Sequence, residues 1–295
     1  FYVWQLFKNG YRFQWILSIP EFDHKSFFKT MQSTFLYVGA TQVYNIVLTA
    51  SISFLPEGVY AIFKYVQNLS NKIKGLFIQP FMTIFFTRYS ILLQKSQSVL
   101  KEFNKNMLSV INVNVITIIG TILLGDFIID LIWGGEKFSK ANVQLAYIFL
   151  LFNGFAVLLG SLGNIYRKMA VAHGKAKKLY LYWVVTQLLS AFFSYLLIKH
   201  FKINGLYYII LINSVLMSIP SYIIYRTTKN ALTFKLFSKD NIVAVILINI
   251  AVLVKYYFIP SITIEYKMDS VFFAGVVVIL LSLYPMLMTY RILKK

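Results

Sequence analysis

The chain lacks cysteine altogether, and acidic residues are scarce, since ten Asp and Glu stand against 29 Lys and Arg among 295 residues. Without cysteine there is no disulfide framework and no thiolate metal site. Charged residues make up 13% of the chain and hydrophobic residues 58%, whereas soluble domains are about 25% charged and about 45–50% apolar. A soluble chain could not bury this much apolar surface, so the composition predicts an all-α, polytopic integral membrane protein.

Catalytic constellations are also missing. The three histidines, His24, His173 and His200, fall in predicted loops. We find no HExxH motif, no nucleophile–histidine arrangement and no pair of carboxylates in a common environment. A GxxxxGK[ST] phosphate-binding loop is absent as well. The sequence therefore predicts a protein that is not an enzyme and that holds no metal or cofactor.

Long apolar runs dominate the remaining sequence. A membrane-spanning helix needs about 20 mostly apolar residues, and eight candidates meet or approach this length. They are residues 31–54, 59–86, 107–125, 143–165, 179–198, 206–225, 242–253 and 271–290, and the seventh can extend through Lys255 to Phe258. The opening FYVWQLF is typical of the tail of an earlier helix. Since the chain begins with Phe1, we expect the start of a longer protein to be missing.

Most of the net charge of +19 lies in the predicted loops between the apolar runs. Alternate loops carry twenty Lys and Arg on one side and six on the other. On a soluble protein this charge would suggest nucleic acid, but here the alternation follows the positive-inside rule. It predicts a multi-pass protein of the cytoplasmic (inner) membrane with its C-terminus in the cytoplasm and no nucleic-acid partner.

The second predicted helix carries polar residues where hydrocarbon is expected, in FKYVQNLSNKIKGLFIQPF. Helical spacing places five of them on one face and Lys72 roughly a quarter turn away. An ammonium at mid-membrane costs at least about 2.5–3.5 kcal/mol, and we expect no carboxylate inside any helix to neutralise it. We therefore predict that this helix lines a hydrated, anion-binding cavity; the alternative is that the segment forms an amphipathic turn at the membrane interface. The candidate cavity residues are Lys64, Gln67, Asn68, Asn71, Lys72 and Lys74. Pro80 is expected to kink this helix.

Two further regions add polar candidates. The first helix has a stripe that includes Gln42 and Asn45, which predicts either a shared polar lumen or hydrogen bonds between packed helices. The loop at 167–178 is basic, as expected for topology and for contact with anionic lipid headgroups. Arg167 and Lys168 stand at its start, and Arg167 is a candidate for a gate or a phosphate contact, because guanidinium binds phosphate through two parallel hydrogen bonds.

The order of these features resembles a known family. The succession is FDHKSFFKTM, a helix with ATQVYN, the turn PEGVYAIFKYVQNL, a helix ending FIQPFMTIFFTRYS, and later LGSLGNIYRKMAVAHGKAKK. It is similar to the second half of polysaccharide and lipid-linked oligosaccharide flippases of the multidrug/oligosaccharidyl-lipid/polysaccharide exporter superfamily, which includes the lipid II flippases. The resemblance covers most of the chain through loose motifs.

The resemblance implies two helical lobes around a central cavity, alternating access, and an undecaprenyl-diphosphate-type substrate whose lipid tail stays in the bilayer. Residues 1–30 would be the end of a preceding helix and a cytoplasmic linker, 31–226 a six-helix C-terminal lobe, and 227–295 a loop with two additional helices. The partners implied are the lipid-linked oligosaccharide or cell-wall precursor, membrane lipids and a missing N-terminal lobe. By this resemblance, the lysines at 64, 72 and 74 with Gln42 and Asn45 would line the cavity, and Arg167 would sit near its cytoplasmic mouth.

Two other functions remain open at this stage. A membrane-embedded glycan polymerase, ligase or glycosyltransferase would need carboxylates or a sizeable outer loop, and the outer loops predicted at 126–140 and 255–269 are short. A multidrug or cation-coupled exporter of the same superfamily would be expected to prefer cationic substrates, which cavity lysines would repel.

Overall fold

The computed structural model describes residues 4, 7–10, 24–95, 99–135, 138–228, 232, 238–259 and 268–294. In this part of the chain the regular structure is helical. The helices are α2 (His24–Ile52), α3 (Val59–Ile73), the π-helix η1 (Lys74–Ile78), α4 (Gln79–Gln94), α5 (Leu100–Trp133), α6 (Lys140–Ala172), α7 (Ala176–Phe201), α8 (Ile203–Arg226), α9 (Lys239–Phe258) and α10 (Met268–Lys294).

The prediction of about eight spans is confirmed. Seven of the described helices are long and apolar enough to cross a membrane, and α3, η1 and α4 make an eighth when the bent pair is taken as one span. The seventh span reaches Phe258, as its apolar continuation predicted. The prediction that residues 1–7 are the tail of an earlier helix falls largely outside the described residues.

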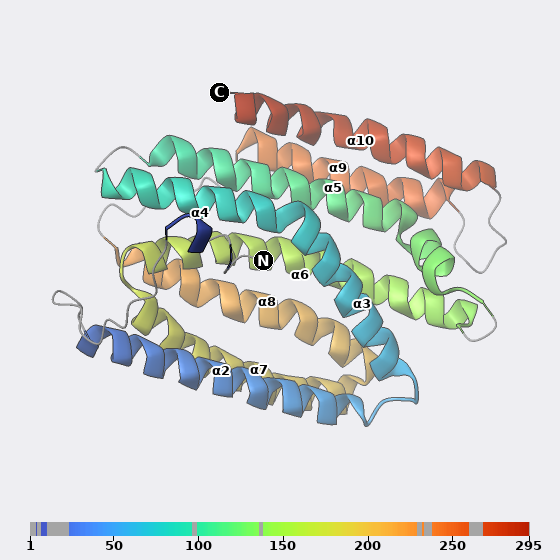
Figure 1. Ribbon diagram of the computed structural model, residues 1–295. Coiled ribbons are helices and arrows are strands. Elements are labelled where there is room, and N and C mark those ends of the chain that lie inside the picture. The colour runs from blue at the N-terminus through green and yellow to red at the C-terminus, as the bar shows by residue number, and fades with distance from the viewer. Residues whose placement is uncertain are drawn as a thin grey trace.

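The helices stack in layers (Figure 1). α2 packs along α7, and α8 packs against both α6 and α7. On the other side, α5 lies between α6 and the pair formed by α9 and α10. The bent span links the two sides, because α3 runs obliquely from the level of α4 to the end of α2 (Figure 1).

The bend in the second span lies at η1, where α3 and α4 meet at 46°. Pro80 occupies the first turn of α4, where its missing N–H costs little. Just before it, the Gln79 N–H bonds to the Lys74 carbonyl, five residues back. Such single-turn π segments frequently occur at functional sites. The kink predicted from Pro80 is therefore present, with a π-helix as its second component.

The contact between α6 and α8 is close because of Gly163. A Cβ atom built on Gly163 would lie 2.7 Å from the Ser218 Cα. The Ser218 hydroxyl donates to the Leu159 carbonyl at 3.0 Å, so a polar bond joins the same two helices. Small residues at the interface let membrane helices approach closely enough for such bonds.

The expectation that no carboxylate lies inside a helix was wrong. α5 runs from Leu100 to Trp133 instead of 107–125, and Asp126 lies within it at 2% exposure. Its Oδ2 is 2.6 Å from the Lys255 Nζ of α9. The hydropathy pattern ends the helix at the first aspartate, whereas in the fold a lysine distant in sequence neutralises that charge and the helix continues.

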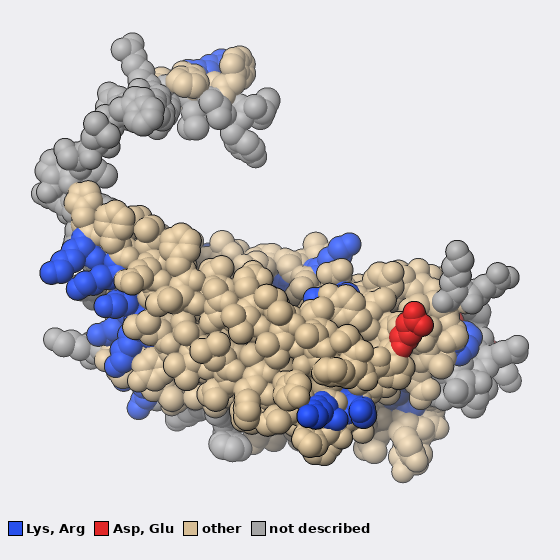
Figure 2. Space-filling model, turned by 90° about the horizontal axis from the view of Figure 1, so that it is seen from below, with Lys and Arg blue, Asp and Glu red and all other residues tan. Residues whose placement is uncertain are grey.

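Basic side chains gather at one end of the lobe. Figure 2 shows Lys and Arg concentrated at one end of the face seen from below, with a broad uncharged middle. Topology places the exposed lysines of the α6–α7 turn at the same end as the start of α2, the end of α4 and the start of α5. The charge asymmetry read from the loops is thus present in the fold.

The close approach of α6 and α8 at Gly163 predicts that a larger residue at this position lowers the stability of the protein. Gly163→Ala forces α6 and α8 apart and should destabilise the protein by about 1–3 kcal/mol, the usual range for overpacking. Thermal unfolding of the purified protein in detergent would measure this as a lower midpoint. Gly160→Ala is the matched control, because a Cβ there meets only the Ser214 hydroxyl at 4.0 Å. Equal midpoints for the two variants would contradict the packing described here.

Candidate functional site

A partly open polar cavity of about 320 Å³ is lined by residues of α2, the η1–α4 segment, α6, α7 and α8. These helices are distant in sequence, and Figure 1 shows how they are arranged. Its lining residues are Tyr37, Lys74, Gln79, Gly160, Gly163, Asn164, Arg167, Trp183, Asn213, Ser214, Met217, Ser218 and Ser221.

Two cations line this cavity. Lys74 is the first residue of η1 and is half-buried at the bend of the second span. Arg167 comes from α6 and stacks over the Trp183 ring at 5.2 Å, which fixes its guanidinium. None of the thirteen described residues that line the cavity is an aspartate or glutamate. The two positive charges therefore repel each other in a site that offers them no resident counter-ion.

Neutral polar groups complete the lining. Asn164 of α6 and Asn213 of α8 both line the cavity, and the Oδ1 atom of each is buried with no hydrogen-bond partner among the described residues. The Ser221 hydroxyl and the Trp183 indole N–H both donate to the Met217 carbonyl, at 3.1 Å each. The two asparagines thus keep hydrogen-bonding capacity that the fold leaves unused, which is typical of sites that bind water or a ligand.

The other residues predicted for the cavity lie outside its lining. The Lys64 ammonium donates to Gln67 Oε1 at 3.2 Å and sits over the Tyr60 ring at 5.6 Å, so it is satisfied within α3. The remaining predicted residues are exposed on the surface of α2 and α3: Gln42, Asn45, Asn68, Asn71 and Lys72. Since polar side chains in a membrane span need water or protein against them, this surface is not suited to lipid.

Lys168, predicted with Arg167 as a gate or headgroup contact, joins two helices. Its ammonium donates to the Met82 carbonyl of α4 at 3.1 Å and sits over the Phe86 ring at 5.4 Å. It does not line the cavity with its neighbour Arg167. The adjacent cations therefore do different things: one faces the cavity and the other holds α4 against α6.

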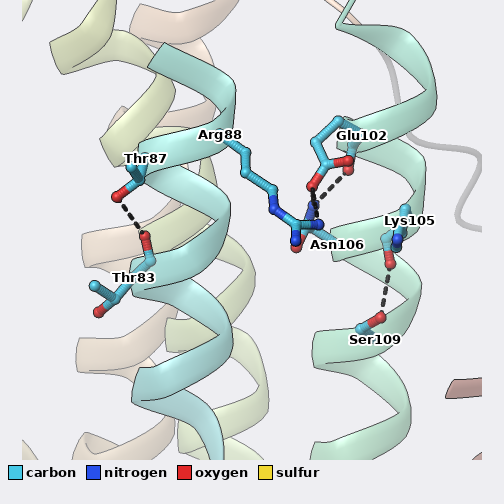
Figure 3. Close-up of polar contacts among 7 residues, drawn as sticks. All are labelled: Thr83, Thr87, Arg88, Glu102, Lys105, Asn106 and Ser109. Atoms are coloured by element: carbon cyan, nitrogen blue, oxygen red, sulfur yellow. Dashed lines mark hydrogen bonds and ion pairs between the residues drawn. The ribbon is translucent and has the colours of Figure 1, made fainter. Parts of the chain in front are cut away.

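The α4 half of the bent span has a second attachment, to α5 (Figure 3). Arg88 points from α4 across to Glu102 of α5, with 3.8 Å between Nη1 and Oε1. Asn106 supports that carboxylate through Nδ2, at 2.9 Å from Oε1. Because Arg88 is more than half exposed, this ion pair contributes little on its own.

A third attachment uses His173, at the turn between α6 and α7. The Tyr89 hydroxyl of α4 lies 3.0 Å from His173 Nε2. The Tyr225 ring, at the end of α8, lies 6.3 Å from the same imidazole at a tilt of 48°, and its hydroxyl accepts the Leu232 N–H at 2.7 Å. Burial, reinforced by the charge of Lys175, lowers the pKa of His173 below its usual value. The imidazole is therefore neutral at pH 7 and joins three helix ends.

An apolar groove of about 620 Å³, which was not predicted, lies along another face of the same bend. Ile73 and Phe77 line it from the bent span, and Val278 and Met286 line it from α10. Gly120 of α5 leaves space along its floor. The groove needs three segments that are far apart in the chain, so only the glycines of α5 could have hinted at it.

A set of long apolar helices with a broken helix beside a cationic cavity is an architecture typical of secondary membrane transporters. Within that class, the family model for "Lipid II flippase MurJ" matches residues 2–281. The chain belongs to the MurJ lipid II flippase family.

A solved structure shares the fold. The chain is similar to "Lipid II flippase MurJ, inward closed conformation", with a TM-score of 0.65 and 17% sequence identity. The match covers 99% of this chain and 60% of that one, so the chain spans about three fifths of its length. None of the curated proteins compared with the chain matches it.

The neutral imidazole makes stability depend on pH. A histidine whose pKa is lowered by folding binds fewer protons in the folded state, so its contribution is present above its unfolded pKa of about 6.5 and declines as pH falls below it. Lowering the pH from about 7.5 to 5.5 should reduce the thermal midpoint of the wild type more than that of His173→Gln, which retains a partner for Tyr89 and does not titrate. If the thermal midpoints of the wild type and of His173→Gln fell by the same amount, His173 would not contribute to the pH dependence of stability.

Proposed function

We propose that this protein is part of a flippase that moves a lipid-linked, undecaprenyl-diphosphate-type oligosaccharide or cell-wall precursor across the cytoplasmic membrane by alternating access. One observation carries the proposal: Lys74 and Arg167 line the same cavity without a carboxylate. An anion entering the cavity would relieve their repulsion and replace the water lost on entry. A diphosphate matches this requirement, because the guanidinium can hold two of its oxygens while the ammonium acts as a point charge.

The apolar groove supports the same substrate class. Lys74 faces the polar cavity, while its neighbours Ile73 and Phe77 line the groove. One π-helix therefore separates a cationic site from an apolar one. A lipid with a diphosphate head and an isoprenoid tail has both chemistries joined by a single bond, and it could occupy the two sites at once across η1.

The bend provides a means of alternating access. The cytoplasmic arm, α4, is held to α5 and α6 through Arg88, Tyr89 and Lys168. The other arm, α3, packs in a separate apolar cluster with α2, α6 and α8. Ligand binding at Lys74, located at the junction, would change the angle between the two arms. This is the kind of broken-helix geometry that transporters use around a central site.

The exposed polar surface on α2 and α3 points to a further lobe. In our proposal, Gln42 and Asn45 of α2 and Asn68, Asn71 and Lys72 of α3 face an aqueous space between two lobes. The domain division at about residues 30 and 226 and the cytoplasmic C-terminus belong to the same proposal. They are supported by the separate packing of α9 and α10 on α5 and by the basic end of the lobe.

The two rival functions fit less well. A glycan polymerase or glycosyltransferase needs carboxylates near its substrate, and none lines the polar cavity in the described part of the chain. A cation exporter would have to admit its substrate past Lys74 and Arg167, which would repel it.

Neutralising the cavity cations tests the function. In cells whose own copy of the gene carries Lys74→Gln with Arg167→Gln, export of the lipid-linked precursor should be lost, because the headgroup's charge is no longer compensated. Lys74→Arg should retain part of the activity, since the charge remains. The measurement is the amount of precursor accessible at the outer face of the membrane, for example to an externally added glycan-modifying enzyme.

The matched control is Lys199→Gln, an exposed lysine near the end of α7, for which export should equal that of the wild type. Membrane levels of each variant would be compared by immunoblot. Full export by the double variant, at normal protein levels, would overturn the assignment of this cavity to the headgroup.

A further inference from the structure

The ion pair between Asp126 of α5 and Lys255 of α9 is the most deeply buried charge pair in the described part of the chain. The two side chains are 3% and 13% exposed, with 2.6 Å between Oδ2 and Nζ. Lys255 also approaches the Leu123 carbonyl at 3.5 Å and the Tyr147 ring at 5.5 Å. The polar cavity does not use either residue.

Side chains of α5 and α6 fix the environment of this ion pair. The Tyr147 hydroxyl donates to the Ile122 carbonyl at 2.7 Å, which fixes the ring beside the ammonium. Gly125 makes room for that ring, since a Cβ there would come within 3.2 Å of it. Three helices therefore converge on one ammonium: α5 with the carboxylate, α6 with the ring and α9 with the lysine itself.

Apolar packing alone fixes α9 weakly. Of its described residues only Ala244 and Ala251 are fully buried. Lipid tails are as apolar as leucine, so no hydrophobic force drives a helix to one height or rotation in a membrane. A single buried charge pair with a short, directional contact can fix the height and rotation of such a helix.

The position of α9 affects α10 and the apolar groove. The two helices share one apolar cluster with α5, and the Tyr284 hydroxyl of α10 donates to Asp240 of α9 at 2.8 Å. α10 in turn forms one wall of the groove through Val278 and Met286. α10 packs mainly on α5, and α9 reaches it through the Tyr284–Asp240 bond, two residues from Met286. A displacement of α9 would therefore act on this part of the groove wall.

We infer that Asp126 and Lys255 are positioning residues: their ion pair sets the height and rotation of α9 and thereby places α10 so that the groove keeps its width. The identity of the groove's occupant, an isoprenoid chain, rests on the proposed function. The width of the groove is independent of the proposed function, and it can be measured without a transport assay.

The absence of cysteine makes a distance measurement direct. Spin labels on Leu76→Cys and Ile279→Cys, two exposed positions beside the groove, would report its width by pulsed electron paramagnetic resonance in lipid nanodiscs. We expect one narrow distance distribution in the otherwise unchanged protein. With Asp126→Asn or Lys255→Gln the distribution should broaden and shift by a few ångström, less than the helical turn of about 5.4 Å.

Three controls make the result decisive. Asp130→Asn removes a carboxylate four residues along the same helix, whose partner Lys140 is 60% exposed, and should leave the distance unchanged. Labels on Val43→Cys and Leu188→Cys, on α2 and α7, should report no change in any variant. The exchanged pair Asp126→Lys with Lys255→Asp should narrow the distribution again.

A single substitution leaves one buried charge unpaired and can prevent folding. The double variant Asp126→Asn with Lys255→Met leaves no such charge, so it tests positioning in a folded protein. A broadened groove distance at an unchanged α2–α7 distance supports the inference. An unchanged groove distance in this folded variant overturns it, and it leaves the headgroup cavity and the proposed function untouched.

Discussion

The need to compensate positive charge in a low-dielectric lobe is the constraint on which the rest of this structure depends. Each cation within the spans must find a carboxylate, an acceptor, an aromatic face or water. Lys255 has a carboxylate, Lys168 a backbone carbonyl and Lys64 an amide with an aromatic ring. Lys74 and Arg167 share a cavity that contains no acid among its lining residues. The fold thus pairs Lys255, Lys168 and Lys64 within the protein, whereas Lys74 and Arg167, which has only the Trp183 ring beside it, lie where an entering anion could pair with them.

Hydropathy was sufficient to predict the eight spans, because about 20 apolar residues per span is a requirement of the bilayer itself. It failed at the end of α5, where Asp126 marked a helix end in the sequence and lies inside a helix in the fold. Its partner is 129 residues away along the chain. Local pattern cannot reveal such a pairing, and the same holds for the groove, whose walls come from η1, α5 and α10.

The candidate site was predictable only in part, because charged residues stand out in the sequence whereas the residues they meet in the fold do not. Charge in an apolar run drew attention to Lys74, and Arg167 was a candidate as the first cation of a basic loop that follows a predicted span. Helical spacing grouped Lys64, Lys72 and Lys74 on or near one face, which is how α3 presents them. Of the three, only Lys74, at the bend, lines the cavity, because at the level of the other two α3 lies away from the polar groups of α6 and α8. Asn164 and Asn213 carry no such signal, since amides within spans more often join helices than bind ligands.

The placement of Lys74 at the π-helix connects chemistry with motion. A π turn stores an extra residue that can move along a helix, and it weakens the local hydrogen bonding that keeps a span straight. Here the residue that opens this turn also carries the charge that an anion would neutralise. Its sequence neighbours line the apolar groove, whose far wall depends on the α9–α10 pair. A lipid bearing an anion and an apolar tail would therefore contact both sides of the one segment whose conformation sets the angle between the arms of the span. Differential binding to two bend angles is what a ligand needs to shift the population between two states of a transporter.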